Sequence, residues 1–353
     1  MDLPREKRSL DPLGHALFSE RVQLGLAYLG KALEIPKKDC TLKTKPNHWV
    51  ITGVGSSEAH GKFLTYLINT HTNYTAEFWV LSQFIEQPKI DKGAGLIVFS
   101  QGLSSNAQLA LKKKDTFSQC VLFSAVSHTT ENKEKRTLLL KLGEEGVQHV
   151  QCTPDNEYTL LIRVAGPLTG YLTCLQWVTQ TLEGTMPEQP QSLFETLAAA
   201  RKVGRELANK ELLTQINKGS VILTQGPTSL FSQNLGYKLT EGLFTQQPQL
   251  CDILSFSHGP FQALCNQLTH AFVLLGSSSH ERLLEKKAIP LLEHCTSSYY
   301  SYQSQLPAPW TIFEYEMFFN GLIEGLLPLS SADQINWPGK GEDGSLYDLS
   351  DLA

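Results

Sequence analysis

Residues 48–69 read HWVITGVGSSEAHGKFLTYLIN and contain the pattern that decides the fold. Residues 48–54 form a short apolar run that ends at glycine, which predicts a buried β-strand. A helix is expected over residues 58–69, because apolar side chains recur there at helical spacing, as at Ala59, Phe63 and Leu67. A buried strand that leads through a polar glycine turn into a helix is typical of a parallel α/β sheet.

The same alternation of strands and helices continues along the chain. In the first half we predict a helix at 16–33, strands at 95–100 and 120–126, and helices at 106–114 and 168–182. The second half repeats the pattern with helices at 193–208, 281–293 and 312–326, a helix ending at Leu243, and strands at 220–225, 271–276 and around 299–302. This order predicts right-handed βαβ crossovers, so the expected fold class is α/β with two lobes, each a mainly parallel sheet flanked by helices.

Length and composition agree with two folded lobes. The chain has 353 residues, about two domains at roughly 150 residues each, and 41% hydrophobic with 18% charged residues is an ordinary globular balance. Residues 181–192 concentrate Gly, Pro and polar residues and form the expected linker. We therefore predict an N-terminal helical segment at 1–35, a first domain at 36–185, a second at 193–329, and a tail at 330–353 that is either disordered or folded over a site.

Charge and cysteine usage exclude several classes of protein. The formal net charge of −5 predicts neither nucleic acid nor an anionic membrane as the main partner, so any anion must be bound locally. No apolar stretch reaches the roughly 18 residues of a spanning helix, and the start lacks the apolar core of a signal peptide, so a cytoplasmic protein is expected. The seven cysteines are scattered without a CxxC pair, which indicates reduced thiols and no zinc site.

The turn after the first strand carries the first chemical signal. A dinucleotide-binding GxGxxG would need glycine where Glu58 stands, and a GxxxxGK[ST] phosphate loop would need glycine at Ser56 and a hydroxyl at Phe63. What remains is a Gly-Ser-Ser turn whose hydroxyls stand at a helix N-terminus, where an anion is favoured. The alternative is that Ser56 and Ser57 only cap the helix.

A second turn of the same kind follows the strand at 95–100. Its sequence, SQGLSSN at 100–106, again places hydroxyl and amide side chains between a buried strand and a helix. Because ligands bind at the carboxyl ends of parallel strands, we expect both turns to meet around one anion. The sequence therefore predicts a binding site for a phosphate monoester.

These residues resemble the sugar isomerase (SIS) domain family, and in particular its tandem members, such as the isomerase half of glucosamine-6-phosphate synthase and its deaminase and deglycase relatives. The resemblance runs from about Val50 to Lys340. Residues 54–57 are similar to the family's Cys-Gly-Thr-Ser loop, and residues 100–105 match Ser-Gln-Ser-Gly-Glu-Thr in part, with Gly102 in place of a serine. The resemblance implies flavodoxin-like lobes and a sugar-phosphate site formed by Ser56, Ser57, Ser100, Gln101 and Ser105.

The second half supplies the rest of the resemblance. Lys238 and Glu241 match a family Lys-x-x-Glu, and the resemblance makes Glu241 the base that moves a proton between C1 and C2. His258, in a Ser-His-Gly-Pro motif, would open the sugar ring, often across a dimer interface. Lys340 stands seven residues after Asp333, the spacing of a family lysine that forms a Schiff base in the synthase branch.

Each of these three residues also has a simpler interpretation. Glu241 is otherwise a solvated glutamate at a helix end, His258 a histidine that bonds to backbone in a turn, and Lys340 a solvated lysine in a tail. Two departures from the family weigh against catalysis. The family has a glutamate at about the position of Asn234, and residues 254–256 read Leu-Ser-Phe where the family has Gly-Glu-Leu.

The function expected from these residues is a phosphosugar isomerase or an amino-sugar phosphate deaminase that acts by enediol-type proton transfer. Such chemistry needs a base and an acid but no metal or cofactor. A homodimer is implied by the resemblance, and synthase activity is not expected because no glutaminase domain is recognised. The alternatives are a non-catalytic protein that senses a sugar phosphate and a scaffold that binds no ligand.

Overall fold

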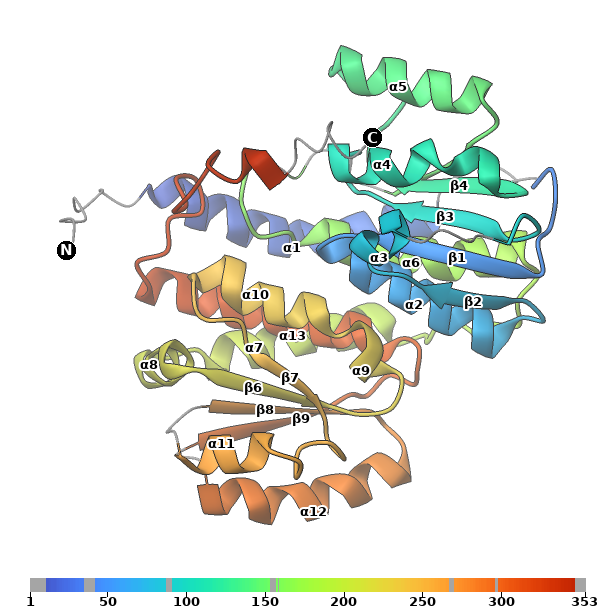
Figure 1. The fold of residues 1–353 in the computed structure, drawn as a ribbon. Helices are drawn as coiled ribbons and strands as arrows, with labels where there is room; N and C mark the ends of the chain where they lie inside the picture. The colour runs from blue at the N-terminus through green and yellow to red at the C-terminus, as the bar shows by residue number, and fades with distance from the viewer. Residues whose placement is uncertain are drawn as a thin grey trace.

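The structure is a computed structural model that describes residues 11–34, 42–86, 91–152, 157, 159–266, 270–295 and 298–346. Two parallel sheets lie one above the other in Figure 1, with helices between them and on their outer sides. The expected α/β architecture with two mainly parallel sheets is thereby confirmed.

The first lobe is built on a five-stranded parallel sheet of order β2-β1-β3-β4-β5. Its strands are β1 (His48–Gly53), β2 (Thr75–Phe78), β3 (Gly95–Phe99), β4 (Gln119–Ser124) and β5 (Gln148–Gln151). Its helices are α1 (Pro12–Glu34), α2 (Ser56–His71), α3 (Leu81–Glu86), α4 (Ser105–Lys112), α5 (Lys133–Glu144) and α6 (Ala165–Thr181). The strand order 2-1-3-4-5 is that of flavodoxin-like folds.

The second lobe has a four-stranded parallel sheet of order β7-β6-β8-β9, the same order with one strand fewer. The strands are β6 (Ser220–Thr224), β7 (Gln249–Asp252), β8 (His270–Leu275) and β9 (Ser298–Gln303). The helices are α7 (Leu193–Leu207), α8 (Lys210–Lys218), α9 (Thr228–Phe231), α10 (Gln233–Leu243), α11 (Pro260–Asn266), α12 (Ser279–Cys295) and α13 (Thr311–Leu326). In this sheet β6 takes the place that β1 has in the first, and β8 the place of β3.

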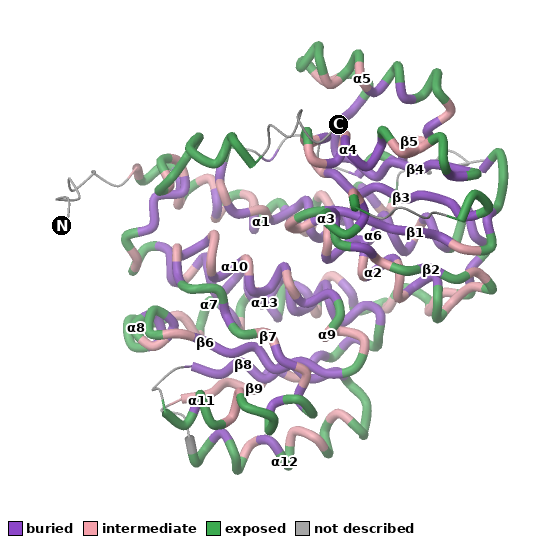
Figure 2. The backbone as a smooth tube through the Cα atoms, in the orientation of Figure 1, coloured by how far each residue is buried: buried purple, intermediate pink, exposed green. Residues whose placement is uncertain are grey.

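The central strands form because their side chains are apolar on both faces, as parallel sheets covered by helices require. In β1, Ile51 packs into the central core between the two sheets, whereas its neighbour Val50 packs into an outer core under α3 and α4. The second sheet divides in the same way, with Phe272 in the central core and Val273 in an outer core under α11 and α12. Figure 2 shows the central strands, such as β3, β4, β6 and β8, buried and much of α5 and α12 exposed.

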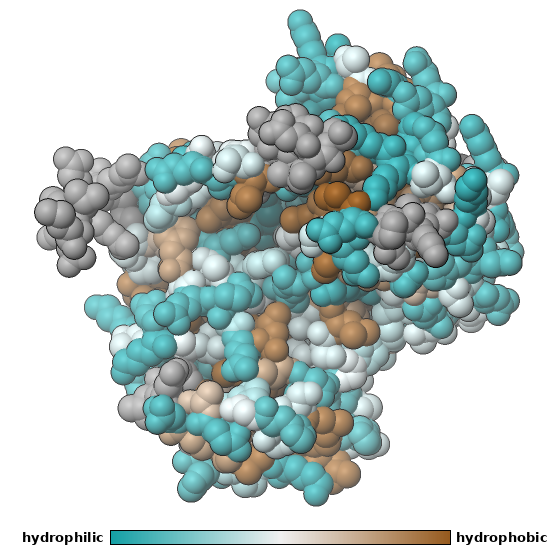
Figure 3. All heavy atoms as spheres, viewed as in Figure 1, coloured by the Kyte–Doolittle hydropathy of each residue, from teal (hydrophilic) through white to brown (hydrophobic). Residues whose placement is uncertain are grey.

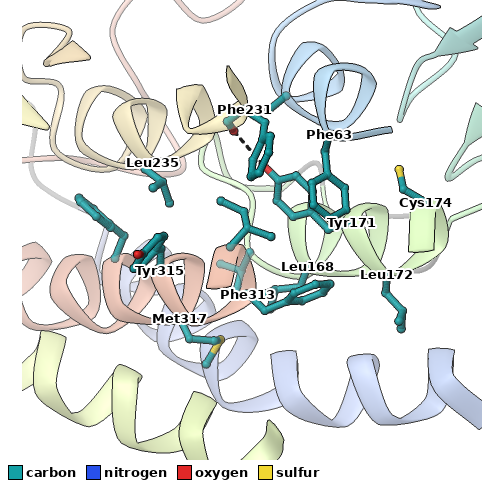
Figure 4. Close-up of a cluster of buried hydrophobic side chains, with 14 of the residues drawn as sticks. Phe63, Leu168, Tyr171, Leu172, Cys174, Phe231, Leu235, Phe313, Tyr315 and Met317 are labelled. Atoms are coloured by element: carbon teal, nitrogen blue, oxygen red, sulfur yellow. Dashed lines mark hydrogen bonds between the residues drawn. The ribbon is translucent and has the colours of Figure 1, made fainter. Parts of the chain in front are cut away.

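The two lobes share the central core. Figure 4 shows Phe63 of α2, Tyr171 of α6, Phe231 of α9 and Phe313 of α13 meeting there, so helices of both lobes contribute aromatic rings to one cluster. The ring centroids of Phe63 and Phe231 are 5.0 Å apart in an edge-to-face arrangement. The Tyr171 hydroxyl donates to the main-chain carbonyl of Phe231 at 3.4 Å, which satisfies the buried phenol.

Helices α7 and α13 approach each other closely through two glycines. A Cβ added at Gly204 would collide with the carbonyl oxygen of Phe318, and one added at Gly321 would collide with that of Arg201. The helices therefore touch backbone to backbone. Beside this contact, the Arg201 guanidinium binds the Glu324 carboxylate through two hydrogen bonds, at 2.8 and 2.9 Å.

The sequence predicted most elements of the two cores within a few residues but missed helix α5 and several short elements. The predicted helix at 16–33 begins earlier, at Pro12, and the predicted strand at 220–225 ends at Thr224. The edge strands β2, β5 and β7, together with helices α3, α5, α8 and α11, were not predicted. Residues 182–192, within the expected linker, contain no helix or strand and connect α6 to α7.

Among the described residues, no helix has the length and apolar composition to cross a bilayer. Of the cysteines in this part of the chain, Cys120, Cys152, Cys174 and Cys251 are buried and Cys265 is exposed; none of the five is in a disulfide. The side chains of Cys40 and Cys295 lie outside the described residues. Figure 3 shows hydrophilic side chains over most of one face, with apolar side chains gathered in separate patches.

Candidate functional site

In the first sheet, the order in which the chain adds strands reverses between β1 and β3. From β1 the chain moves outward to β2 and then crosses back to add β3 on the other side. Gly53 at the end of β1 pairs with Phe99 at the end of β3, so the two following loops leave the sheet at the same level. Open α/β sheets bind ligands in the crevice that such a switch point creates.

A cavity of about 720 Å³ lies at this switch point. Both predicted loops line it, and so do side chains of α5, α10 and the segment before α6. The lining includes all five residues predicted to hold a phosphate, together with the predicted base: Ser56, Ser57, Ser100, Gln101, Ser105 and Glu241. The structure thus brings the two serine-bearing loops to a single cavity.

The first loop leaves its serine hydroxyls available. Gly55 has φ 63° and ψ −131° and is itself the N-cap of α2, without any side-chain hydrogen bond to the helix end. The positive φ favours glycine at this position. Neither Ser56 nor Ser57 bonds through its hydroxyl to another described residue, so the alternative that these serines only cap α2 does not hold.

The second loop is tightened by its own hydroxyl. The Ser100 Oγ accepts the N–H of Ser104 at 3.0 Å, which closes the turn before α4 begins. A Cβ at Gly166 would collide with the carboxamide of Gln101, so the glycine leaves room for that side chain at the start of α6. The hydroxyl of Ser105 bonds to no other described residue. The cavity is therefore lined by three serines, Ser56, Ser57 and Ser105, whose hydroxyls bond to no other described residue.

Two cationic side chains of the cavity were not predicted from the sequence. Arg163 lines it while its guanidinium donates to the main-chain carbonyls of Leu160, at 2.6 Å, and Glu157. Lys135, in the first turn of α5, also lines the cavity, and burial lowers the pKa of its ammonium group. Both charges favour an anion and offset the carboxylates of Glu134 and Glu241 in the same lining. Neither residue belongs to a glycine-serine turn, so no sequence signal marked them.

Glu241 reaches the cavity from α10. Burial raises the pKa of its carboxyl group, and the nearby charges of Arg163 and Lys238 oppose that shift. Lys238 is itself buried, with its ammonium 3.1 Å from the Glu316 carboxylate and donating to the Arg163 carbonyl at 2.5 Å. Burial outweighs the charges of Arg163 and Lys238, so the Glu241 carboxyl group has a proton affinity above the ordinary value.

The Asp333-Gln334 pair lies against the same helix end. Gln334 is fully buried and donates from Nε2 to the carbonyl oxygens of Glu241, at 2.7 Å, and Gly242, at 3.0 Å. Asp333 accepts the N–H groups of Ile335 and Asn336 and holds the turn that presents Gln334. This motif fixes the backbone of the predicted base.

His258 and Lys340 do not line the cavity. His258 is exposed in the loop between β7 and α11, and its main-chain N–H donates to the Ser255 carbonyl at 3.0 Å. The Lys340 ammonium donates to the Ile335 carbonyl at 2.7 Å and stands 4.3 Å from the centre of the Trp337 ring. Their predicted catalytic roles remain predictions.

Within the part of the chain that the structure describes, no group of three or more His, Cys, Asp or Glu side chains could hold a metal ion. Among the described histidines of the first lobe, His60 is the buried one. His60, one turn into α2, has its pKa lowered to about 4 by burial, and its Nε2 lies 3.1 Å from the Pro167 carbonyl. It is therefore a neutral side chain of the core below the cavity.

No protein-family model matches the sequence. No curated protein matches it either. Solved structures do match along nearly the whole chain. The C-terminal domain of glucosamine-fructose-6-phosphate aminotransferase from Francisella tularensis matches with TM-score 0.70 and 11% identity, covering 90% of this chain and 97% of that one.

Two further matches have similar extent. Glucosamine-6-phosphate deaminase from Thermotoga maritima has TM-score 0.65 and 14% identity, covering 91% of this chain and 97% of that one. Tagatose-6-phosphate ketose/aldose isomerase from Escherichia coli has TM-score 0.64 and 11% identity, covering 92% and 90%. The chain therefore has the tandem sugar isomerase fold, which confirms the expected fold class and the resemblance at the level of the fold.

Proposed function

We propose that this protein binds a sugar phosphate in the cavity at the β1/β3 switch point. The observation that carries the proposal is that one cavity collects the unbonded hydroxyls of Ser57 and Ser105 from two separate loops. Arg163 and Lys135 add positive charge, which a phosphate monoester needs in a protein of net charge −5. The names of the matched structures, which refer to hexose or hexosamine 6-phosphates, support this class of ligand.

The reaction proposed is proton transfer between adjacent carbons of the sugar, as an aldose–ketose isomerase or an amino-sugar phosphate deaminase performs it. Glu241 is the proposed base, because it lines the same cavity and its pKa is raised by burial. A carboxylate with raised proton affinity can both accept and return a proton near neutral pH. With the phosphate held by the loops, the sugar carbons would extend toward α10.

The test is Glu241→Gln in the full chain, with Glu206→Gln on the exposed side of α7 as the matched control. Conversion of hexose 6-phosphates and ammonia release from glucosamine 6-phosphate are measured together with ligand-induced melting shifts. We expect turnover to fall about 10²–10⁴-fold in Glu241→Gln while the melting shift persists. Unchanged turnover in this variant removes Glu241 as the base.

A second candidate function is a non-catalytic sensor of a sugar phosphate. It is favoured by the positions of His258 and Lys340 outside the cavity and by Gly102, where the resemblance would place a serine. A sensor shows the melting shift in wild-type protein without turnover of any sugar phosphate. A scaffold without a ligand shows neither, since only a molecule that prefers the folded state stabilises it.

A further inference from the structure

The second serine loop contains a leucine in a backbone conformation that favours glycine. Leu103 has φ 51°, in the left-handed region, where the Cβ of an L-residue is crowded by its own backbone. Two other described residues with a side chain, Glu183 and Phe244, have a positive φ, but of the three only Leu103 lines the cavity at the switch point. Glycine stands at this position in the Ser-Gln-Ser-Gly-Glu-Thr motif that residues 100–105 resemble. The loop therefore carries a backbone strain that glycine would avoid.

The side chain of Leu103 holds the residue in this conformation. It is 2% exposed and belongs to the outer core under α3 and α4. Leu81 at the start of α3, Val98 of β3 and Ala107 of α4 are members of the same core. Burying an apolar side chain stabilises the folded state and offsets the backbone strain. Leu103 therefore anchors the loop to this core, which glycine could not do because it has no side chain.

Hydrogen bonds fix the backbone on both sides of the anchor. The Leu103 N–H donates to the Ser100 carbonyl at 3.2 Å. The Gln101 carbonyl accepts the N–H of Ala125, which follows β4, at 2.9 Å. These bonds hold the turn against itself and against the neighbouring strand. Because α4 begins at Ser105, two residues after the anchor, the place of the Ser105 hydroxyl in the cavity depends on this turn.

We propose that Leu103 is a positioning residue that holds the second serine loop in its ligand-binding shape before a sugar phosphate arrives. This role rests on the proposed function, because it concerns the same phosphate site. A loop that is already ordered loses less conformational entropy on binding, so more of the interaction free energy appears as affinity. Gly102, which replaces a serine of the motif, removes one hydroxyl and adds backbone freedom to the loop. The anchor at the next residue restricts that freedom.

The first experiment measures the loop without a ligand. Amide hydrogen exchange at residues 100–105 is compared in the wild-type full chain, Leu103→Gly and Leu103→Ala. Leu142→Ala, in the last turn of α5, is the matched control, because Leu142 is buried in the same outer core and does not line the cavity. We expect the N–H groups of residues 103 and 104 to exchange at least about tenfold faster in both Leu103 variants than in the control, because the loop then opens without removing a leucine side chain from the core. Leu103→Met keeps the volume of the side chain and should exchange like the wild type.

The second experiment is calorimetric titration of the same proteins with fructose 6-phosphate. Leu103→Gly should raise the Kd about tenfold, and where turnover is measured the KM should rise while kcat is unchanged, because the reacting groups are untouched. Leu103→Met and Leu142→Ala should bind like the wild type.

The proposal is overturned if the loop amides exchange equally in the wild type and Leu103→Gly, if Leu103→Gly binds as tightly as the wild type, or if Leu142→Ala weakens binding by the same factor. Absence of binding in the wild type overturns the proposed function instead, since faster exchange in Leu103→Gly would still establish the anchor.

Discussion

Gln334 joins the backbone of Glu241 to the first lobe: its Nε2 donates to the Glu241 carbonyl at 2.7 Å, and its Oε1 accepts the N–H of Ile162 at 3.2 Å. One buried amide therefore links the C-terminal segment, the end of α10 and the loop before α6. The position of the proposed base depends on this bridge, because Glu241 lies in the last turn of its helix.

Replacing Gln334 with leucine should destabilise the protein strongly. The change leaves the N–H of Ile162 and the carbonyls of Glu241 and Gly242 without their partner, and each unpaired buried group costs about 1–3 kcal/mol. Urea unfolding should show a loss of more than about 2 kcal/mol. Gln225→Leu is the matched control, because the Gln225 carboxamide is buried and has no hydrogen-bond partner among the described residues, so its loss should cost little. An equal loss of stability in both variants would contradict this difference between the two amides.

Gly321→Ala should destabilise the packing of α7 on α13. The new methyl group would collide with the main-chain carbonyl of Arg201. Because a helix backbone cannot move aside as a side chain can, we expect the free energy of unfolding to fall by about 1–3 kcal/mol. Gly143→Ala, in α5 where nothing lies within 4 Å of the added atom, should instead stabilise by roughly 0.5–1 kcal/mol. Equal effects of the two substitutions in thermal unfolding would exclude the close helix contact.

The raised pKa of Glu241 predicts a pH dependence. In the folded state this carboxyl group holds its proton more tightly than in the unfolded state, so its contribution to stability is present at low pH and is lost as pH rises through the raised pKa. Glu241→Gln should therefore be more stable than wild type at pH 7, and the difference should disappear near pH 4. A difference that grows on acidification would show that the carboxyl group is stabilised in its charged form.

The lowered pKa of His60 predicts a pH dependence of stability with the opposite sign. Its pKa of about 4 in the folded protein lies below that of an unfolded histidine, so the unfolded state takes up the proton first and stability falls as pH decreases from about 6.5 to 4. In His60→Gln the amide can still donate to the Pro167 carbonyl but does not titrate. The stability of wild type relative to this variant should decline by up to about 1.4 kcal/mol per pH unit over that interval. If the free energies of unfolding of wild type and His60→Gln differ by the same amount at every pH in this interval, His60 is not a buried neutral histidine.

The sequence predicted the central strands because they are apolar on both faces. β3 and β8 are continuous runs of buried residues, and a glycine or serine follows each. The edge strand β2 reads Thr-Ala-Glu-Phe and is partly exposed, so it has no apolar run to recognise. Strands of this kind form because a neighbouring strand pairs with them, which local sequence does not encode.

The candidate site was predictable only in part, for a similar reason. The glycine-serine turns at Ser57 and Ser105 lie directly after predicted strands, so the rule for parallel sheets places them together. Arg163 and Lys135 reach the cavity through tertiary packing of segments far along the chain.

The most direct test of the central claim, that both serine loops hold one phosphate, is the melting shift that glucosamine 6-phosphate or fructose 6-phosphate produces. Wild-type protein, Ser57→Ala, Ser105→Ala and the exposed control Ser192→Ala are compared at equal ionic strength. We predict that each cavity variant loses most of the shift seen in wild type, whereas Ser192→Ala keeps it. A full shift in either cavity variant, or no shift in wild type, would contradict a shared phosphate site.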